Sequence, residues 1–281
     1  AVRIAVLHGS SLELYVCDVD QDIPESWAGH SRAGEYRALR RQHLLDELRD
    51  LAAPLTRQGL DVATVCEWHV PLEQGIGYHV IRTHPDLVVK GTHRHAAVPR
   101  VALTRTDWNL IGQIPAPLLL VGTRPWAGRL RIAAAVDSSH PAGYPLALDQ
   151  LIVDEARGLA DALGGTLEVY HVLQPQPHLP GEQAPPQHQA AAHAQARRAI
   201  ELLAGHNDAT TRLAEGGLVD CLVQLVEAHI PDVLVMGTGL RPRRTHSAAS
   251  GTAAQLLERI GCDLLVVKPP GFISPLLVTD G

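Results

Sequence analysis

The chain carries one pattern of residues twice, in the same order, and this repeat limits the folds that are open to it. Residues 85–92 (PDLVVKGT) match residues 231–238 (PDVLVMGT), which sets an offset of 146 residues (237 − 91). The same offset carries residues 117–121 onto residues 263–267. Independent matches that keep one order indicate a duplicated domain.

We place the two domains at residues 1–126 and 127–281, and the second reads as a complete alternation of strands and helices. Its predicted strands are residues 131–137, 166–173, 210–214, 233–236 and 264–268. Its predicted helices are residues 144–163, 190–204, 218–228 and 253–261, with a loop at residues 174–189. This alternation predicts an α/β fold with a parallel sheet and right-handed crossovers. Ligands of such sheets bind at the carboxyl ends of the strands.

The first domain repeats the plan, but one strand has no counterpart in the sequence. Its predicted strands are residues 12–16, 62–68, 87–90 and 118–121, and its predicted helices are residues 2–8 and 36–56. No segment matches the strand at residues 131–137, which is central in a sheet of this kind. Two explanations are open. Either the chain begins inside the domain, or the apolar run at residues 276–280 (LLVTD) fills the empty position.

The composition is that of a globular protein without a membrane span. The formal net charge is −6, and 46% of the residues are hydrophobic and 19% charged. The apolar runs are far shorter than the roughly 20 residues that a spanning helix needs. The negative charge argues against general nucleic-acid binding. Four cysteines without paired spacing predict reduced thiols and a cytoplasmic protein.

The stretch at residues 231–239 (PDVLVMGTG) predicts a ligand site. Its four apolar residues are typical of a strand that is buried on both faces. Glycines, a loop with three arginines and a helix start at Gly251-Thr252 follow. Glycine lets a backbone come close to a ligand, and the free amides at a helix start favour an anion. These features indicate a phosphate cradle, although an ordinary strand-to-helix connection also uses glycine in its turns.

Together these residues resemble the universal stress protein family. In that family the first strand ends in Asp, a His-Val pair ends the second strand, and a glycine loop follows the fourth. Gly-Ser or Gly-Thr then precedes the last helix. The matching residues here, which form the candidate nucleotide site, are Asp137, His171, Val172, Met236, Gly237, Gly239, Gly251 and Thr252. Two copies in one chain and the motif at residues 105–108 (RTDW) resemble the tandem, E-type branch.

The resemblance implies two Rossmann-like domains of the adenine nucleotide alpha hydrolase type. Each is expected to have a mostly parallel five-stranded sheet with helices on both faces. It also implies a non-enzymatic stress-response protein of the cytoplasm that binds ATP or another small ligand. Terminal strands pair across a two-fold axis in the family, so residues 118–121 and 264–267 are expected to join the two halves. A homodimer is compatible with this plan, and we predict no catalytic residue and no metal site.

The glycine loop departs from the spacing of ATP-binding members, which have glycine, two residues, glycine, nine residues, then glycine with Ser or Thr. Leu240 stands at the second glycine position, Gly239 lies one residue early, and ten residues separate Leu240 from Gly251. In the first domain the offset puts His93 and Arg105 where the second domain has Gly239 and Gly251. We therefore expect the first domain to be a degenerate copy.

Two other functions are open on the same fold: a slow ATPase or nucleotide-dependent enzyme, and an interaction scaffold without a ligand. The chain lacks a P-loop lysine and a general base after the glycine loop, which weighs against the enzyme. His93 and His95 are compatible with a metal site. Surface histidines of a loop are favoured, because zinc needs about four ligands and no cysteine or carboxylate lies nearby at metal spacing.

Overall fold

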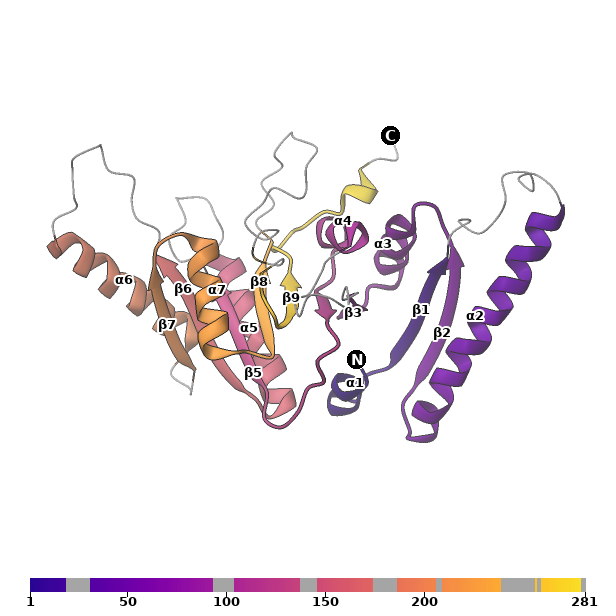
Figure 1. Cartoon of the computed structure of the whole chain (residues 1–281), viewed down its shortest axis with the longest axis horizontal. Helices are drawn as coiled ribbons and strands as arrows, with labels where there is room; N and C mark the ends of the chain where they lie inside the picture. Colours follow the sequence, from indigo (N-terminus) through magenta and orange to yellow (C-terminus); the bar gives the residue numbers. More distant parts are fainter. Residues whose placement is uncertain are drawn as a thin grey trace. The chain divides into compact units, whose positions relative to one another are not determined.

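The computed structural model describes residues 1–18, 31–92, 104–136, 146–173, 186–205, 209–238, 256 and 259–278. The chain divides into two compact units, and each is treated by itself. The smaller unit is Ala1–His84 with Val278–Gly281, and the larger unit is Pro85–Leu277. Figure 1 traces the helices and strands of both units along the chain.

The larger unit is built on a seven-stranded sheet with the order β3-β4-β9-β8-β5-β6-β7. Its strands are β3 (Val88–Gly91), β4 (Leu118–Val121), β5 (Arg131–Val136), β6 (Thr166–Leu173), β7 (Thr210–Glu215), β8 (Val233–Gly237) and β9 (Asp263–Val267). All neighbouring strands run parallel except β4 and β9. The order β7-β6-β5-β8-β9 gives the second domain the five parallel strands that the sequence predicted.

The central strands of this sheet are buried on both faces, which explains their continuous apolar sequences. Ile132 and Ala133, successive residues of β5, are both fully buried. Leu234 and Val235 of β8 are fully buried as well. Successive side chains of a strand point to opposite faces, so each face must be covered by helices. These strands form the core of the larger unit.

Three helices follow the strands in the order that right-handed crossovers require. They are α5 (Leu146–Leu163), α6 (Pro186–Ala204) and α7 (Leu218–His229). Helices α5 and α6 contact each other on one face of the sheet, and α7 packs on β6 and β7. In Figure 1, α7 lies in front of the sheet and α5 behind it.

Helix α6 begins earlier than the sequence predicted. Residues 186–189 were assigned to a loop because proline, glutamine and histidine are frequent there, but they form the first turn of α6. Pro186 is the first helical residue, a position at which proline loses no hydrogen bond and its fixed φ suits the helix. Residues 174–185 lie outside the described residues, and so does most of the predicted helix at residues 253–261.

The antiparallel pair β4–β9 joins the two copies of the repeat, as predicted. Leu118 lies opposite Val266, and Leu120 lies opposite Leu264. Asp263 strengthens the junction, because its carboxylate accepts hydrogen bonds from the Gly122 amide and the Trp126 indole, both at 2.8 Å. The segment that connects the two copies is thereby fastened to the first residue of β9.

The smaller unit contains α1 (Val2–His8), β1 (Leu12–Asp18), α2 (Ser31–Arg57), β2 (Val62–Trp68) and α3 (Leu72–Thr83). Strands β1 and β2 form a two-stranded parallel sheet that is paired along its whole length, from Leu12 opposite Val62 to Asp18 opposite Trp68. Helix α2 starts at Ser31, five residues before the predicted start at Tyr36.

The sheet of the first domain is in two pieces, β1–β2 and β3–β4. By sequence β1 corresponds to β6 and β3 to β8, and in the second domain β5 lies between those two strands. Among the described residues no strand pairs with the other edge of β1 or of β3. The first domain therefore lacks a counterpart of β5 in the described part of the chain.

The suggestion that residues 276–280 fill this position is wrong for the residues that the structure describes. Leu276 and Leu277 belong to a 3₁₀ helix, η4 (Pro275–Leu277), which contacts α4 (Arg105–Gln113). The Ser274 hydroxyl donates to the Gln113 carbonyl at 2.6 Å and accepts from the Leu276 amide at 3.3 Å. These bonds turn the segment away from a strand. Residues 279–281 lie outside the described residues.

Candidate functional site

The structure describes four of the eight candidate site residues, and all four lie at or near the carboxyl ends of two strands of one sheet. His171 and Val172 directly precede Leu173, the last residue of β6, and Met236 and Gly237 end β8. Strand β5 runs between them. Asp137, Gly239, Gly251 and Thr252 lie outside the described residues. The topology thus places the described candidates at the sheet edge where ligands of this fold class bind.

His171 links the ends of two strands. It lies opposite Val136 in the β5–β6 ladder and is 0% exposed. Its Nδ1 lies 3.0 Å from the carbonyl oxygen of Val136, so the tautomer with a proton on Nδ1 donates this hydrogen bond. Val172, the next residue, is buried as well. The imidazole therefore fixes the backbone immediately before Asp137.

Gly237 allows helix α5 to pack closely on β8. A methyl group at this position would lie 2.8 Å from Cδ2 of Leu148 and 3.0 Å from Cδ1 of Ile152. Both distances are shorter than ordinary van der Waals contact, so a side chain here would force Leu148 and Ile152 of α5 to shift. Close packing of α5 is therefore one reason for a glycine at position 237.

Thr238 follows β8 and has a hydroxyl group without a partner among the described residues. Its amide donates to the carbonyl of Val267 at 3.1 Å, which extends the β8–β9 ladder by one bond. The residue is only 8% exposed, and within the described part of the chain its Oγ1 has no hydrogen-bond partner. A buried hydroxyl without a partner costs about 1–3 kcal/mol, so the site favours a ligand that supplies one.

The counterpart of Thr238 in the first domain is Thr92, and its hydroxyl is satisfied. The Thr92 amide donates to the Val121 carbonyl at 2.8 Å, and the Thr92 hydroxyl donates to the same oxygen at 3.1 Å. The two threonines thus make the same backbone contact to corresponding strands. They differ in the side chain, because the Thr92 hydroxyl bonds to Val121 and the Thr238 hydroxyl has no partner among the residues that the structure describes.

An ion pair occupies the corresponding helix start in the first domain. Asp107 is fully buried, and its Oδ1 lies 2.6 Å from Nζ of Lys90. Its Oδ2 accepts from the amide and the hydroxyl of Thr104 at 2.7 and 2.9 Å, which completes the capping box of α4. The protein itself supplies the negative charge that a helix start attracts. A helix start that already holds a carboxylate has less attraction for a phosphate.

Sequence reasoning missed both Thr238 and the Lys90–Asp107 pair. The signals were present, since the offset of 146 residues puts Lys90 in the place of Met236. Thr104 followed three residues later by Asp107 resembles the capping-box pattern of Ser/Thr followed by an acidic residue. The partner of the Lys90 ammonium depends on the fold, because strand β3 and helix α4 are separated in sequence.

Two negative findings apply to the described residues. No helix among them is long and apolar enough to cross a membrane. No group of three or more histidines, cysteines, aspartates and glutamates among them is arranged to hold a metal ion. His93 and His95, the histidines that had suggested a metal, lie outside this part of the chain.

Comparison with known proteins relates both halves of the chain to one family. The model of the Universal stress protein family matches residues 1–122 and 129–268. Universal stress protein E of Escherichia coli K12 is 30% identical over 234 residues, which cover 79% of this chain and 73% of that protein. Universal stress protein E of Salmonella typhi is 28% identical over 245 residues, or 83% of this chain and 76% of that protein.

Solved structures agree with this relationship. A protein of Pseudomonas aeruginosa PAO1 is 26% identical and superposes with a TM-score of 0.68, covering 95% of this chain and 85% of that chain. A universal stress protein of Archaeoglobus fulgidus is 11% identical and has a TM-score of 0.70 over 95% of this chain and 91% of that chain. The second likeness, at its low identity, concerns the fold alone.

Proposed function

The chain belongs to the universal stress protein family, and on this premise we propose that it is a stress-response protein whose second domain, residues 127–281, binds a small ligand. The proposed ligand is an adenine nucleotide, with ATP as the first candidate. The proposed site lies at the carboxyl ends of β5 and β8. The first domain, residues 1–126, serves as a structural copy that pairs with the second.

The observation that carries this proposal is the unpartnered hydroxyl of Thr238. It is buried at the carboxyl end of β8, directly after Gly237. A phosphate or ribose oxygen offers the acceptor that the described protein does not supply. In the first domain the corresponding hydroxyl, that of Thr92, donates to the Val121 carbonyl, and Asp107 occupies the neighbouring helix start. The contrast supports a ligand in one domain and not in the other.

We assign the remaining candidate residues by their position along the chain. Asp137, His171 and Val172 would lie near the base and the sugar, because Asp137 follows β5 in the sequence and the other two lie near the end of β6. Met236 and Gly237 would flank the ligand at the end of β8. Gly239, Gly251 and Thr252 would offer backbone amides and a hydroxyl to the phosphates. The bond from His171 to Val136 would then position the backbone that leads to Asp137.

Isothermal titration of the whole chain with ATP tests the proposal, and the repeat supplies a matched control. Thr238→Val should weaken ATP binding at least about tenfold, since a hydrogen bond to a charged acceptor contributes roughly 1.5–3 kcal/mol. Thr92→Val removes the counterpart hydroxyl and should leave the affinity unchanged. Equal weakening by both variants, or no heat with ATP, ADP and AMP, would reject the assignment. Turnover of labelled ATP would favour the enzymatic alternative.

We also propose the cytoplasm as the location, on the basis of the cysteines. Cys17, Cys66, Cys221 and Cys262 are all buried and free. Burial raises the pKa of Cys262 to about 12, so its thiol stays protonated and unreactive. Reduced, unpaired thiols are typical of proteins in a reducing compartment. Fractionation of cells that express the chain, followed by immunoblotting, tests the location.

A further inference from the structure

The smaller unit contains a pocket of about 410 Å³ at the carboxyl end of β2. Ligand pockets of proteins have volumes of about 300–1,000 Å³, so this cavity is large enough for a small molecule. Three ring side chains, Trp68, His69 and Tyr78, form part of its wall. Three charged residues, Arg41, Glu67 and Arg82, complete the polar part of the lining. This combination of rings and charges points to a ligand with both an apolar and an ionic part.

The ring wall is held in place by close packing of helix α3. A methyl group at Gly75 would lie 2.5 Å from Cβ of His69 and 2.8 Å from Sγ of Cys17. The glycine therefore lets α3 come close to the end of the strand. Nδ1 of His69 lies 3.1 Å from the Pro71 carbonyl oxygen, and the His69 and Tyr78 rings are 5.5 Å apart. The wall is thus formed by residues at the end of β2 and by Tyr78 of α3.

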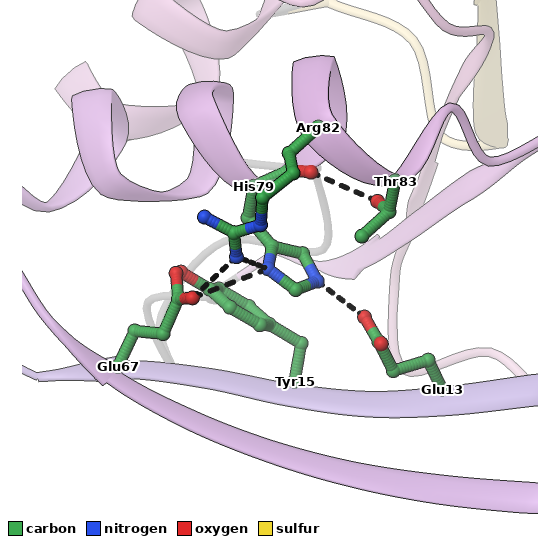
Figure 2. A network of polar contacts seen from close by, with 6 residues as sticks. All are labelled: Glu13, Tyr15, Glu67, His79, Arg82 and Thr83. Carbon is green, nitrogen blue, oxygen red and sulfur yellow. Dashed lines mark hydrogen bonds and ion pairs between the residues drawn. The ribbon is translucent and has the colours of Figure 1, made fainter.

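A polar network on one side of the pocket holds Glu67 and Arg82, and Figure 2 shows it. The Arg82 guanidinium is paired with Oε1 of Glu67 and lies 2.8 Å from Nδ1 of His79. His79 stacks on Tyr15, with ring centroids 4.2 Å apart, and its Nε2 bonds to Glu13. The Tyr15 hydroxyl donates to Oε2 of Glu67 at 3.1 Å.

This network keeps Glu67 ionised and already paired. Burial alone would raise the pKa of Glu67, but the hydrogen bonds from Arg82 and Tyr15 outweigh it, so the pKa lies below its usual value. The negative charge of Glu67 and the positive charge of Arg82 therefore neutralise each other. Neither group is left to balance the charge of a ligand.

Arg41 supplies a positive charge that no described carboxylate balances. It projects from α2 into the pocket lining. Two acidic groups of the same unit are engaged with other arginines: Asp18 pairs with Arg40 at 3.0 Å, and Glu67 pairs with Arg82. Burial raises the pKa of the Cys66 thiol, so this lining residue stays neutral as well. The pocket carries one excess positive charge.

We propose that this pocket binds a small aromatic monoanion, a carboxylate attached to a planar ring system. The Arg41 guanidinium pairs with the carboxylate through two parallel hydrogen bonds, a geometry for which arginine is suited. The rings of Trp68 and Tyr78 contact the planar body of the ligand. A dianion such as a phosphate monoester is disfavoured, because one excess positive charge balances only one negative charge and the second would stay unpaired in the pocket.

Isothermal titration of the whole chain with 2-naphthoate tests the proposal. The wild-type chain should bind it, and Arg41→Gln should weaken binding at least tenfold. Arg57→Gln serves as the matched control, because this variant also removes one exposed positive charge from the same helix. Arg57 is not part of the pocket lining. Trp68→Leu should weaken binding as well, while circular dichroism confirms that each variant is folded.

Uncharged and doubly charged analogues complete the test. 2-Naphthamide should bind at least tenfold more weakly than 2-naphthoate, and 2-naphthyl phosphate should not bind more tightly. The proposal is overturned if the wild-type chain gives no heat with millimolar 2-naphthoate. It is also overturned if Arg57→Gln weakens binding as much as Arg41→Gln, or if the amide or the phosphate binds as well as the carboxylate.

Discussion

Leu119 of β4 lies directly opposite Leu265 of β9, and the two residues hold the same position in the two copies of the repeat. Their neighbours follow the same relationship, because Leu118 faces Val266, the counterpart of Leu120. An operation that exchanges the two copies therefore exchanges the members of each pair. This is the signature of a local two-fold axis that passes between Leu119 and Leu265, here within one chain.

The first prediction concerns the energy of this junction. Leu119 and Leu265 are 1% and 3% exposed, so Leu119→Ala and Leu265→Ala should each lower the free energy of unfolding by about 2–5 kcal/mol. Because the two side chains belong to one contact, the double variant should lose less than the sum. Urea denaturation measures all three. Leu202→Ala, at a residue that is 76% exposed, should change stability by less than about 0.5 kcal/mol.

The second prediction compares two glycines that are counterparts in the repeat. Gly237→Ala should destabilise the protein by about 1–3 kcal/mol, because the added methyl group collides with Leu148 and Ile152 of α5. Gly91→Ala should be close to neutral, since no atom beyond its chain neighbours lies within 4 Å of the added group. Thermal unfolding of the two variants measures the difference. Equal losses would show that α5 does not limit the space at position 237.

The third prediction concerns the ion pair of the first domain. Lys90→Met leaves the buried carboxylate of Asp107 without its partner and should cost about 3 kcal/mol, as for other broken buried pairs. Lys90→Met with Asp107→Asn removes both charges and keeps an acceptor for Thr104, so it should cost less than Lys90→Met alone. Chemical denaturation checks the order. A double variant less stable than the single variant would contradict the pairing.

The fourth prediction concerns pH and Lys268. Burial lowers the pKa of Lys268 to about 8 from 10.5, and the ammonium lies 5.2 Å from the Phe272 ring and bonds to the Ile111 carbonyl. Between these two pKa values the unfolded chain holds a proton that the folded chain has released. Stability from this group therefore increases as pH rises from about 8 towards 10, by roughly 2–3 kcal/mol at most.

The variant Lys268→Met isolates this contribution from the other titrating groups. At pH 7 it should be as stable as the wild-type chain or more stable, because the wild-type chain must bury a charge there. At pH 9.5 the wild-type chain should have gained stability relative to the variant. Urea denaturation at both pH values provides the comparison. A difference between the two proteins that does not change with pH would refute the lowered pKa.

The sequence predicted most of the second domain because its strands are buried on both faces. A short, continuous apolar run such as residues 233–236 is typical of a central strand. The repeat showed the order of the strands along the chain. Helix starts were less accurate. Ser31 and Pro186 begin helices α2 and α6 inside stretches where proline, glycine and polar residues suggested loops.

The sites were predicted only in part, for a physical reason that differs between the two units. The carboxyl ends of β6 and β8 followed from the topology, so the sequence placed His171 and Gly237 correctly near these ends, while their part in a site stays a prediction. The role of Thr238 depends on the strand that receives its amide bond, which the sequence alone does not identify. The pocket of the smaller unit was not predicted, because Arg41 and Tyr78 meet only after α2 and α3 have packed on β2.

The antiparallel pairing of β4 with β9 has a consequence for how the two copies diverge. Because the two copies belong to one chain, they are always present in equal numbers. A short connection also gives each copy an effective concentration in the millimolar range for the other. The segment between them is fastened by Asp263, through Gly122 and Trp126. Loss of ligand contacts in one copy then removes no site from the other. Permanent attachment would thus allow the two copies to take the different roles proposed above for Thr92 and Thr238.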